Sequence, residues 1–325
     1  MQLLHQDYRI ALLIAEHHVP PALVLNLDQF GLKILSLGDK TRAPIGAKSV
    51  PVIGADDKRQ ITGVPVVAAD GTLVSLQLIW EGKTDRCHPK GEEKCDKIKH
   101  SHSVSHWSTF ETMVELIARI DAYRLEVINR DKLSPLQKLV LIIDVWSVHV
   151  SKAFRELVRT KYPFILLNYI PPRCTSKGQV CDLVVNKKMK DFANDTTCNE
   201  VAQSVAAQLS AMRAAGEIRH VSIDIKLTVL KPVVCAGMRA GIEYFETGEG
   251  RELIKKGFLK AGVTRCFDTD FQRQAVAWVA SNPQERAPSF ESEEVTPPSA
   301  ALHTLDAIAV AVDDEIVEVL EEGQI

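Results

Sequence analysis

The stretch that decides the fold is Ala22-Leu23-Val24-Leu25-Asn26-Leu27-Asp28, a short and almost uninterrupted apolar run that ends in an aspartate. A second run, Leu139-Val140-Leu141-Ile142-Ile143-Asp144, has the same pattern. Near-continuous apolar runs of this length are typical of strands buried on both faces of a sheet. Ligand sites in such α/β sheets form beyond the carboxyl ends of the strands. If the two strands are parallel neighbours, Asp28 and Asp144 converge at one edge.

The segments around these runs predict a mixed sheet flanked by helices. Asp70-Gly71 lies between two β-type runs and is a strong hairpin signal, because the primed turn needs positive φ. A helix over 8–18 is expected to stop at Pro20-Pro21, and residues 82–106 are polar and irregular. The other expected elements are strands over 48–54, 60–68, 73–80, 138–144 and 164–167, and helices over 109–129, over 151–161 and from near Asp182. This order predicts an α/β fold.

The chain divides into three predicted regions. Residues 1–195 hold the α/β core, and residues 196–280 form a helical extension. The extension is expected to break at its glycines Gly216, Gly237 and Gly241. After Pro283 the composition changes to Pro, Ser and Glu, which predicts a flexible acidic tail over 281–325. An amphipathic helix over 302–320 is expected within that tail.

The composition indicates a globular protein with reduced thiols. Hydrophobic residues make up 46% and charged residues 25% of the chain, which is enough for a packed core. No apolar run approaches the ~20 residues that span a bilayer, and Asp7, Arg9 and Glu16 interrupt the first apolar stretch, unlike a secretory signal. Seven cysteines without framework spacing predict an intracellular compartment.

Charge is distributed unevenly. Residues 151–190 carry nine Lys and Arg against two acids, whereas residues 281–325 carry eleven acids against one Arg. The basic stretch lies beside Asp144 and around Asp182, where the backbone of a polyanion would need to lie. A charge run alone is typical of a solvated helix face, but its position here favours a nucleic-acid partner.

A third aspartate, Asp182, opens a helical pattern directly after the loop 171–179. Three carboxylates suit a pair of Mg²⁺ ions about 3.5–4 Å apart, the arrangement that stabilises charge in phosphoryl transfer. Taken singly, each aspartate is better explained as the end of a strand or the cap of a helix. Together with the neighbouring sequence, the three favour a metal site.

Several blocks around the three aspartates occur in a characteristic order. They are Asn26–Gly31, Lys58–Thr62, Asp70-Gly71, Gln77–Thr84, Leu141–His149, Tyr169–Ser176, Gln179–Asp182, Asn186-Lys187 with Lys190, and Lys256–Gly262. In order and spacing they resemble the DDE superfamily transposases of the pogo/Tigger/jerky kind, over roughly residues 8–265. Two positions depart from the family: Phe30 stands where Thr is usual, and Val180 where Pro is common. Neither departure removes a metal ligand.

The resemblance implies a ribonuclease-H-like fold in which Asp28, Asp144 and Asp182 hold Mg²⁺ or Mn²⁺. In the family this site activates water, and then a DNA 3′-hydroxyl, for strand cleavage and transfer. DNA is then the expected partner and the nucleus the expected compartment, with no membrane and no small-molecule cofactor, and a homodimer is left open. The residues expected to contact nucleic acid are His149, Lys177, Gln179, Lys187, Lys188 and Lys190.

Other roles remain open for some polar residues. For His149, a role in capping or packing is about as good an explanation as contact with phosphate. For Gln179, a structural role in its loop is as good an explanation as a hydrogen bond to Asp182. Trp107 and Trp146 suit base stacking, although packing is the commoner role. One further group crowds the polar segment: Cys87, His88, Cys95, His100, His102 and His106. Because these residues lack the paired spacing of a compact zinc finger, we expect an exposed insertion loop there.

Three functional hypotheses follow. The first is a metal-dependent DNA endonuclease or transposase catalytic domain. The second is a catalytically silent, domesticated or truncated transposase relative that binds nucleic acid or a partner protein. Family members usually carry helix-turn-helix modules, and only 27 residues precede Asp28 here, so no such module is expected unless one is encoded upstream of Met1. The third is a ribonuclease H-type enzyme acting on RNA–DNA hybrids.

Overall fold

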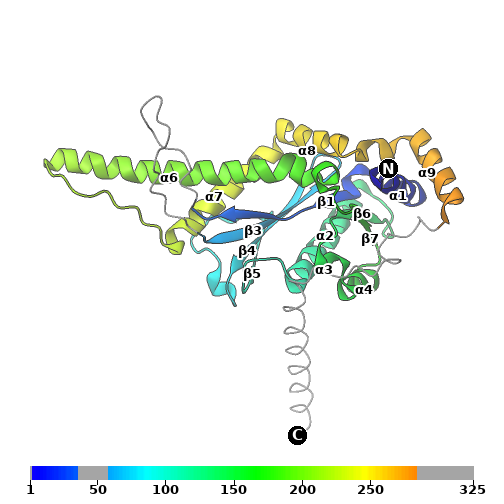
Figure 1. The fold of residues 1–325 in the computed structure, drawn as a ribbon, viewed down its shortest axis with the longest axis horizontal. Helices are drawn as coiled ribbons and strands as arrows, with labels where there is room; N and C mark the ends of the chain where they lie inside the picture. Colours follow the sequence, from blue (N-terminus) through cyan, green and yellow to red (C-terminus); the bar gives the residue numbers. More distant parts are fainter. Residues whose placement is uncertain (1, 36–57, 284–325) are drawn as a thin grey trace, which may run out of the picture. The chain divides into compact units, whose positions relative to one another are not determined.

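A seven-stranded sheet runs through the centre of the chain, in the order β5-β4-β3-β1-β6-β7 with β2 paired to β3 (Figure 1). The strands are β1 (Val24–Leu27), β2 (Phe30–Lys33), β3 (Gln60–Ala68), β4 (Leu73–Glu81), β5 (Ile98–Ser103), β6 (Leu139–Ile143) and β7 (Ile165–Tyr169). β1 is antiparallel to β3 and parallel to β6, and β6 is parallel to β7. The expected mixed sheet is thereby confirmed.

The computed structural model describes residues 2–35 and 58–283. The strand expected over 48–54, the acidic helix expected over 302–320 and all but the first residues of the tail expected over 281–325 lie outside the described residues. The described part belongs to one compact unit, Met1–Pro283. The expected boundary near residue 195 falls inside a helix that continues without interruption to Ala215.

β1 and β6 form because their side chains can be buried on both faces. All residues of both strands are buried, and Leu25, Leu27 and Ile142 are completely so. Each such aliphatic side chain contributes roughly 1.5–3 kcal/mol through burial. The register pairs Leu25 with Leu141 and Asn26 with Ile142. The one polar member, Asn26, is therefore buried at the centre of the sheet.

The expected hairpin between β3 and β4 is present. Gly71 has φ +95, and the backbone N–H of Thr72 donates to Asp70 Oδ1 over 2.9 Å. A Cβ at Gly71 would lie 2.7 Å from the backbone oxygen of Arg251, so glycine is also required by the close approach of a helix. The turn thus meets both a conformational and a packing demand.

Helices cover both faces of the sheet. They are α1 (Gln2–His17), α2 (Phe110–Asp131), α3 (Ser147–Val150), α4 (Lys152–Lys161), α5 (Thr175–Gly178), α6 (Asn186–Ala215), α7 (Leu227–Glu246), α8 (Gly248–Lys260) and α9 (Thr269–Ser281). In Figure 1, α1, α8 and α9 gather on one side of the sheet and α2, α3 and α4 on the other. Among the described residues, no helix is both long and apolar enough to span a bilayer.

Side-chain caps mark several helix starts. Thr109 and Thr112 form a reciprocal capping box at the start of α2, and Ser151 accepts from the backbone of Phe154 at the start of α4. Such caps satisfy backbone donors that the first helical turn leaves unpaired. They explain why these two helices begin close to the residues that the sequence indicated.

Two expectations for the C-terminal half were wrong. Gly237 and Gly241 do not break a helix but lie inside α7, where they allow close packing on α6. A Cβ at Gly237 would lie 2.7 Å from Ala193 Cα, and one at Gly241 would lie 2.6 Å from Met189 Sδ. Only Gly216 ends a helix as expected, with φ +65 at the end of α6.

The prediction that residues 82–106 are irregular was also wrong in part, because this segment contains β5. This strand runs parallel to β4, with Leu76 paired to Ile98 and Trp80 paired to His102. Its buried positions are the small polar residues Ser101 and Ser103. A strand without apolar alternation gives no periodic signal.

Candidate metal centre

Asp28 and Asp182 meet at the carboxyl end of β1, although they are far apart in the sequence. Asn186 joins them, because its Nδ2 donates to Asp28 Oδ2 over 2.8 Å and to Asp182 Oδ1 over 3.0 Å. Asn186 is buried, with 4% of its surface exposed. The structure thus brings Asp28 and Asp182 together, and it adds Asn186, which the sequence analysis named only within a family block, as a contact of both acids.

The proximity of the two carboxyl groups changes their chemistry. The pKa of Asp28 is raised from 3.8 to about 8. The main cause is burial, followed by the negative charge of Asp182 and a hydrogen bond with that residue. A hydrogen bond from Gln179 opposes this increase but is outweighed. Two carboxylates held this close favour either a shared proton or a cation.

A π-helical turn, Cys181–Val185, presents Asp182 to the site. It precedes α6, so Asp182 and Asn186 lie on consecutive turns of one helical segment. A π turn inserts an extra residue into the helical repeat, and such turns are frequent at functional sites. The local geometry lets the carboxylate of Asp182 and the amide of Asn186 reach each other.

Asn26 and Gln179 form a buried network beneath the two acids. Asn26 Nδ2 donates to Gln179 Oε1 over 2.7 Å and to the carbonyl oxygen of Ile142 over 3.1 Å, and its Oδ1 accepts from the backbone N–H of Cys181 over 3.0 Å. Gln179 Nε2 donates to the carbonyl oxygen of Leu27 over 2.9 Å. The network ties β1 to β6 and to the turn that carries the third acid.

Asp144 lies at the corresponding position of the neighbouring strand. Asn26 pairs with Ile142. Asp28 lies two residues after Asn26, and Asp144 lies two residues after Ile142. Residues two apart on a strand face the same side of the sheet, and parallel strands lie about 4.8 Å apart. The register therefore places the two aspartates side by side at one edge.

The carboxylate of Asp144 is held by His149. His149 Nδ1 lies 2.7 Å from Asp144 Oδ1 and 3.3 Å from the backbone oxygen of Asp144; because a carbonyl oxygen only accepts, a proton on Nδ1 serves both contacts. His149 is 1% exposed, and the hydroxyl of Tyr169 donates to its carbonyl oxygen over 2.8 Å. His149 Nε2 is buried and has no hydrogen-bond partner among the described residues. The histidine thus orients the second acid.

The three acids are brought to one edge without full convergence. Within residues 2–35 and 58–283, they do not form a group whose ligand atoms all lie within 4.8 Å of one another. The donor chemistry still fits a hard divalent cation, since Asp28, Asp144 and Asp182 all offer carboxylate oxygens. Oδ1 of Asn186, the residue that joins Asp28 and Asp182 through Nδ2, is buried and has no hydrogen-bond partner among the described groups.

The residues expected to contact nucleic acid divide into two groups. Gln179 and His149 are 0% and 1% exposed, so direct contact does not fit this structure, and both support the acids instead. The side chain of Gln179 bonds Asn26 and the carbonyl oxygen of Leu27, and it opposes the increase in the pKa of the first acid, Asp28. Lys177 is exposed on the short helix α5, before Asp182. Its contact with nucleic acid stays a prediction.

The expected lysine contacts on α6 all have intramolecular partners. Lys187 Nζ lies 3.0 Å from Asp191 Oδ2. Lys188 Nζ lies 4.8 Å from the ring centre of Tyr244, and Lys190 Nζ lies 5.6 Å from that of Phe30. These contacts are surface interactions of modest strength. The three ammonium groups can therefore be redirected to phosphate at small cost, and that role also stays a prediction.

No protein-family model and no curated protein matches the chain. Among solved structures, a pre-cleavage Mos1 transpososome is similar over 85% of this chain and 62% of the other, with 8% identity and a TM-score of 0.42. The catalytic domain of Mos1 mariner transposase is similar over 85% of this chain and 93% of the other, with 8% identity and a TM-score of 0.39. A mariner Mos1 paired end complex with Mg is similar over 88% of this chain and 63% of the other, with 9% identity and a TM-score of 0.39. This chain spans 62% of the first chain's length, and values this low describe only a loose likeness.

Proposed function

We propose that this chain is a DDE-type, transposase-derived nuclease domain of the pogo/Tigger/jerky kind, acting on DNA in the nucleus. Asp28, Asp144 and Asp182 would hold Mg²⁺ or Mn²⁺. The observation that carries the proposal is the bridge from Asn186 to both Asp28 and Asp182, together with the equal register of β1 and β6, which Asp28 and Asp144 directly follow. A structural turn or cap does not require Asp28 and Asp182, two acids from distant segments, to meet at one buried amide.

Each residue has a definable task in this chemistry. A bound divalent cation would supply Lewis-acid stabilisation of charge on phosphate oxygens. Asn186 holds Asp28 and Asp182 in a fixed relation through its two hydrogen bonds. His149 holds Oδ1 of Asp144 through Nδ1, and the other carboxylate oxygen of Asp144 would be the metal ligand. The buried Asn26–Gln179 pair keeps the supporting backbone rigid.

Nicking of supercoiled plasmid DNA tests the proposal. The wild-type protein should nick the plasmid in Mg²⁺ or Mn²⁺ and not in chelator, and Asp144→Asn should abolish nicking because a ligand is lost. Asp195→Asn is the matched control, because Asp195 is exposed on α6 away from the acids. Nicking by Asp144→Asn at the wild-type rate would contradict the assignment.

The alternative of a catalytically silent transposase relative rests on a specific observation. Asp144 Oδ1 is engaged by His149, and the three acids are not within 4.8 Å of one another in the described structure. A domain that keeps this arrangement in solution would bind DNA without cleaving it. Retention of a DNA fragment in a gel-shift assay, with no nicking in either metal, would favour that alternative.

A further inference from the structure

The connection between β4 and β5, residues 82–97, contains no buried residue. It joins two parallel strands and contains only one short 3-10 helix, Asp85–Cys87. Connections of this length without an apolar anchor are uncommon in compact domains unless they have a function. Burial of side chains therefore does not explain how this segment is held in place.

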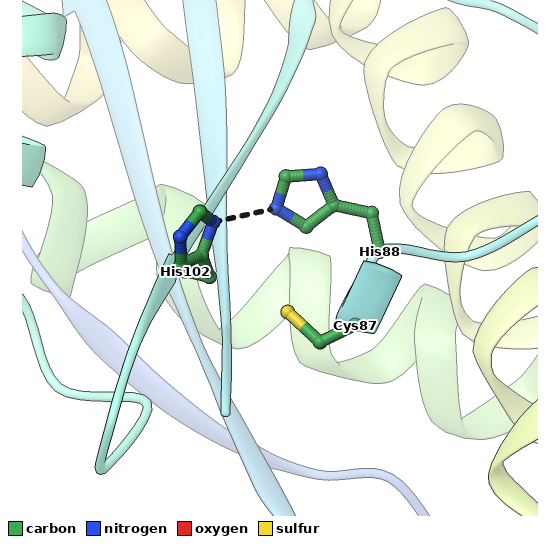
Figure 2. Close-up of side chains that lie close together, drawn as sticks. All are labelled: Cys87, His88 and His102. Atoms are coloured by element: carbon green, nitrogen blue, oxygen red, sulfur yellow. Dashed lines mark hydrogen bonds between the residues drawn. The ribbon is translucent and has the colours of Figure 1, made fainter. Parts of the chain in front are cut away.

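Three donor groups of the connection and of β5 point toward one another (Figure 2). His88 Nε2 lies 3.3 Å from His102 Nδ1, and Cys87 Sγ completes a group whose ligand atoms all lie within 4.8 Å of one another. Cys87 and His88 are adjacent in sequence, whereas His102 comes from β5. The group thus links the loop to the strand that follows it.

The backbone around Cys87 is shaped to present the thiol. Gly82 has φ +155, and a Cβ there would lie 2.5 Å from Cys87 Cβ and 2.7 Å from its Sγ. Only glycine therefore allows Cys87 to lie against the end of β4. Lys231, from α7, donates to the carbonyl oxygen of Cys87 and lies 5.1 Å from the ring centre of Trp80. The close fit against Gly82 and the hydrogen bond from Lys231 thus both fix the position of Cys87.

A fourth donor is within reach. Asp85 Oδ1 lies 3.4 Å from His102 Nδ1 and 3.7 Å from His88 Nδ1. The side chain of Asp85 is 87% exposed and can rotate at little cost. One sulfur, two imidazole nitrogens and one carboxylate oxygen make a set of four, which is the number that tetrahedral Zn²⁺ requires.

A neighbouring group, Glu92, His100 and Cys235, also has its ligand atoms within 4.8 Å of one another, but it is already saturated by hydrogen bonds. The indole N–H of Trp80 donates to His100 Nδ1 over 2.9 Å, so that nitrogen is unprotonated. His100 Nε2 then carries the proton and faces Glu92 Oε1 at 2.5 Å. A metal at this nitrogen would have to displace both that proton and the contact with Glu92, whereas the nitrogens of the first group face each other and the exposed Asp85, so the first group is the better site.

We propose that Cys87, His88, His102 and Asp85 form a structural zinc site that pins the β4–β5 connection to β5. Sulfur and imidazole donors select Zn²⁺ over Mg²⁺ or Mn²⁺, which prefer oxygen. On binding, the Cys87 thiol releases its proton to solvent and the thiolate becomes the ligand. The site is separate from the three acids and does not depend on the proposed nuclease activity.

Cobalt substitution tests the site, because Co²⁺ bound by a thiolate gives a charge-transfer band that carboxylate sites do not give. Reduced, metal-free protein titrated with Co²⁺ should develop this band with one equivalent and lose it on addition of Zn²⁺. Cys87→Ser should lose the band. Cys95→Ser, in the same connection, and Cys235→Ser, in the neighbouring group, should retain it.

Two results would overturn the proposal. One is a wild-type protein that shows no thiolate band with Co²⁺, and the other is a Cys87→Ser protein that keeps the band. If Cys87→Ser does not fold, His102→Gln decides in its place. It keeps the thiol but should lose the tetrahedral spectrum, and an unchanged spectrum for His102→Gln contradicts the site.

Discussion

Replacement of Asp28 by asparagine should make the protein more stable at alkaline pH. Burial and the charge of Asp182 raise the pKa of Asp28 from 3.8 to about 8. The folded state therefore binds more protons than the unfolded state between these values, and stability falls as pH rises through that window. The asparagine side chain of the Asp28→Asn variant resembles the protonated acid, since its amide can donate to Asp182 and accept from Asn186.

The size of the loss in stability follows from the shift in the pKa of Asp28. Between about pH 5 and pH 8, a carboxyl group with these two pKa values loses at most about 3 to 4 kcal/mol of stability. Asp28→Asn removes this loss, so its advantage over wild type should grow by that amount across the window. For a domain of this size the difference corresponds to roughly 5–10 °C in melting temperature.

Thermal unfolding followed by circular dichroism in metal-depleted buffers measures the difference. At about pH 8, added Mg²⁺ should raise the melting temperature of wild type, because a cation relieves the repulsion of two carboxylates, and should leave Asp28→Asn almost unchanged. Asp191→Asn, which breaks an exposed pair with Lys187, should follow wild type at every pH. Parallel pH profiles for wild type and Asp28→Asn would refute the proximity of Asp28 and Asp182.

Two further predictions concern packing and buried polar groups. Asn26→Ala removes the hydrogen bonds to Gln179 Oε1 and to two backbone groups, so the free energy of unfolding measured in urea should fall by about 3 kcal/mol or more; a change below about 1 kcal/mol would contradict the network. Gly237→Ala would place a Cβ 2.7 Å from Ala193 Cα and should cost about 1–3 kcal/mol. Gly248→Ala, with open space at its Cβ, should cost little, and equal melting temperatures for the two variants would argue against close α6–α7 packing.

Much of the sheet could be predicted because its signals are local. The apolar runs before Asp28 and Asp144 require burial on both faces, and the structure places them as adjacent parallel strands. Asp70-Gly71 predicted the hairpin because only certain residues adopt its backbone conformation. In each case one short segment carries the physical requirement, so no knowledge of distant contacts is needed.

The remaining features depend on contacts that no local pattern encodes. β5 was missed because Ser101 and Ser103 occupy its buried positions, and without β5 the approach of His102 to Cys87 could not be inferred. Glycines inside α7 appeared to be helix breaks because the close approach of α6 is a tertiary property. Asn186 gave one signal that reasoning could have used, namely its position four residues after Asp182 on a helical segment.

Calorimetric titration with Mn²⁺ tests the central claim most directly, namely that three acids from separate segments form one cation site. Wild type should bind Mn²⁺, and Asp28→Asn, Asp144→Asn and Asp182→Asn should each weaken binding by at least about tenfold, with Asp195→Asn unaffected. Loss of binding in all three variants, with folding intact, is the result that the structure predicts. Wild-type affinity in Asp144→Asn would show that the second acid stays with His149 and takes no part in the site.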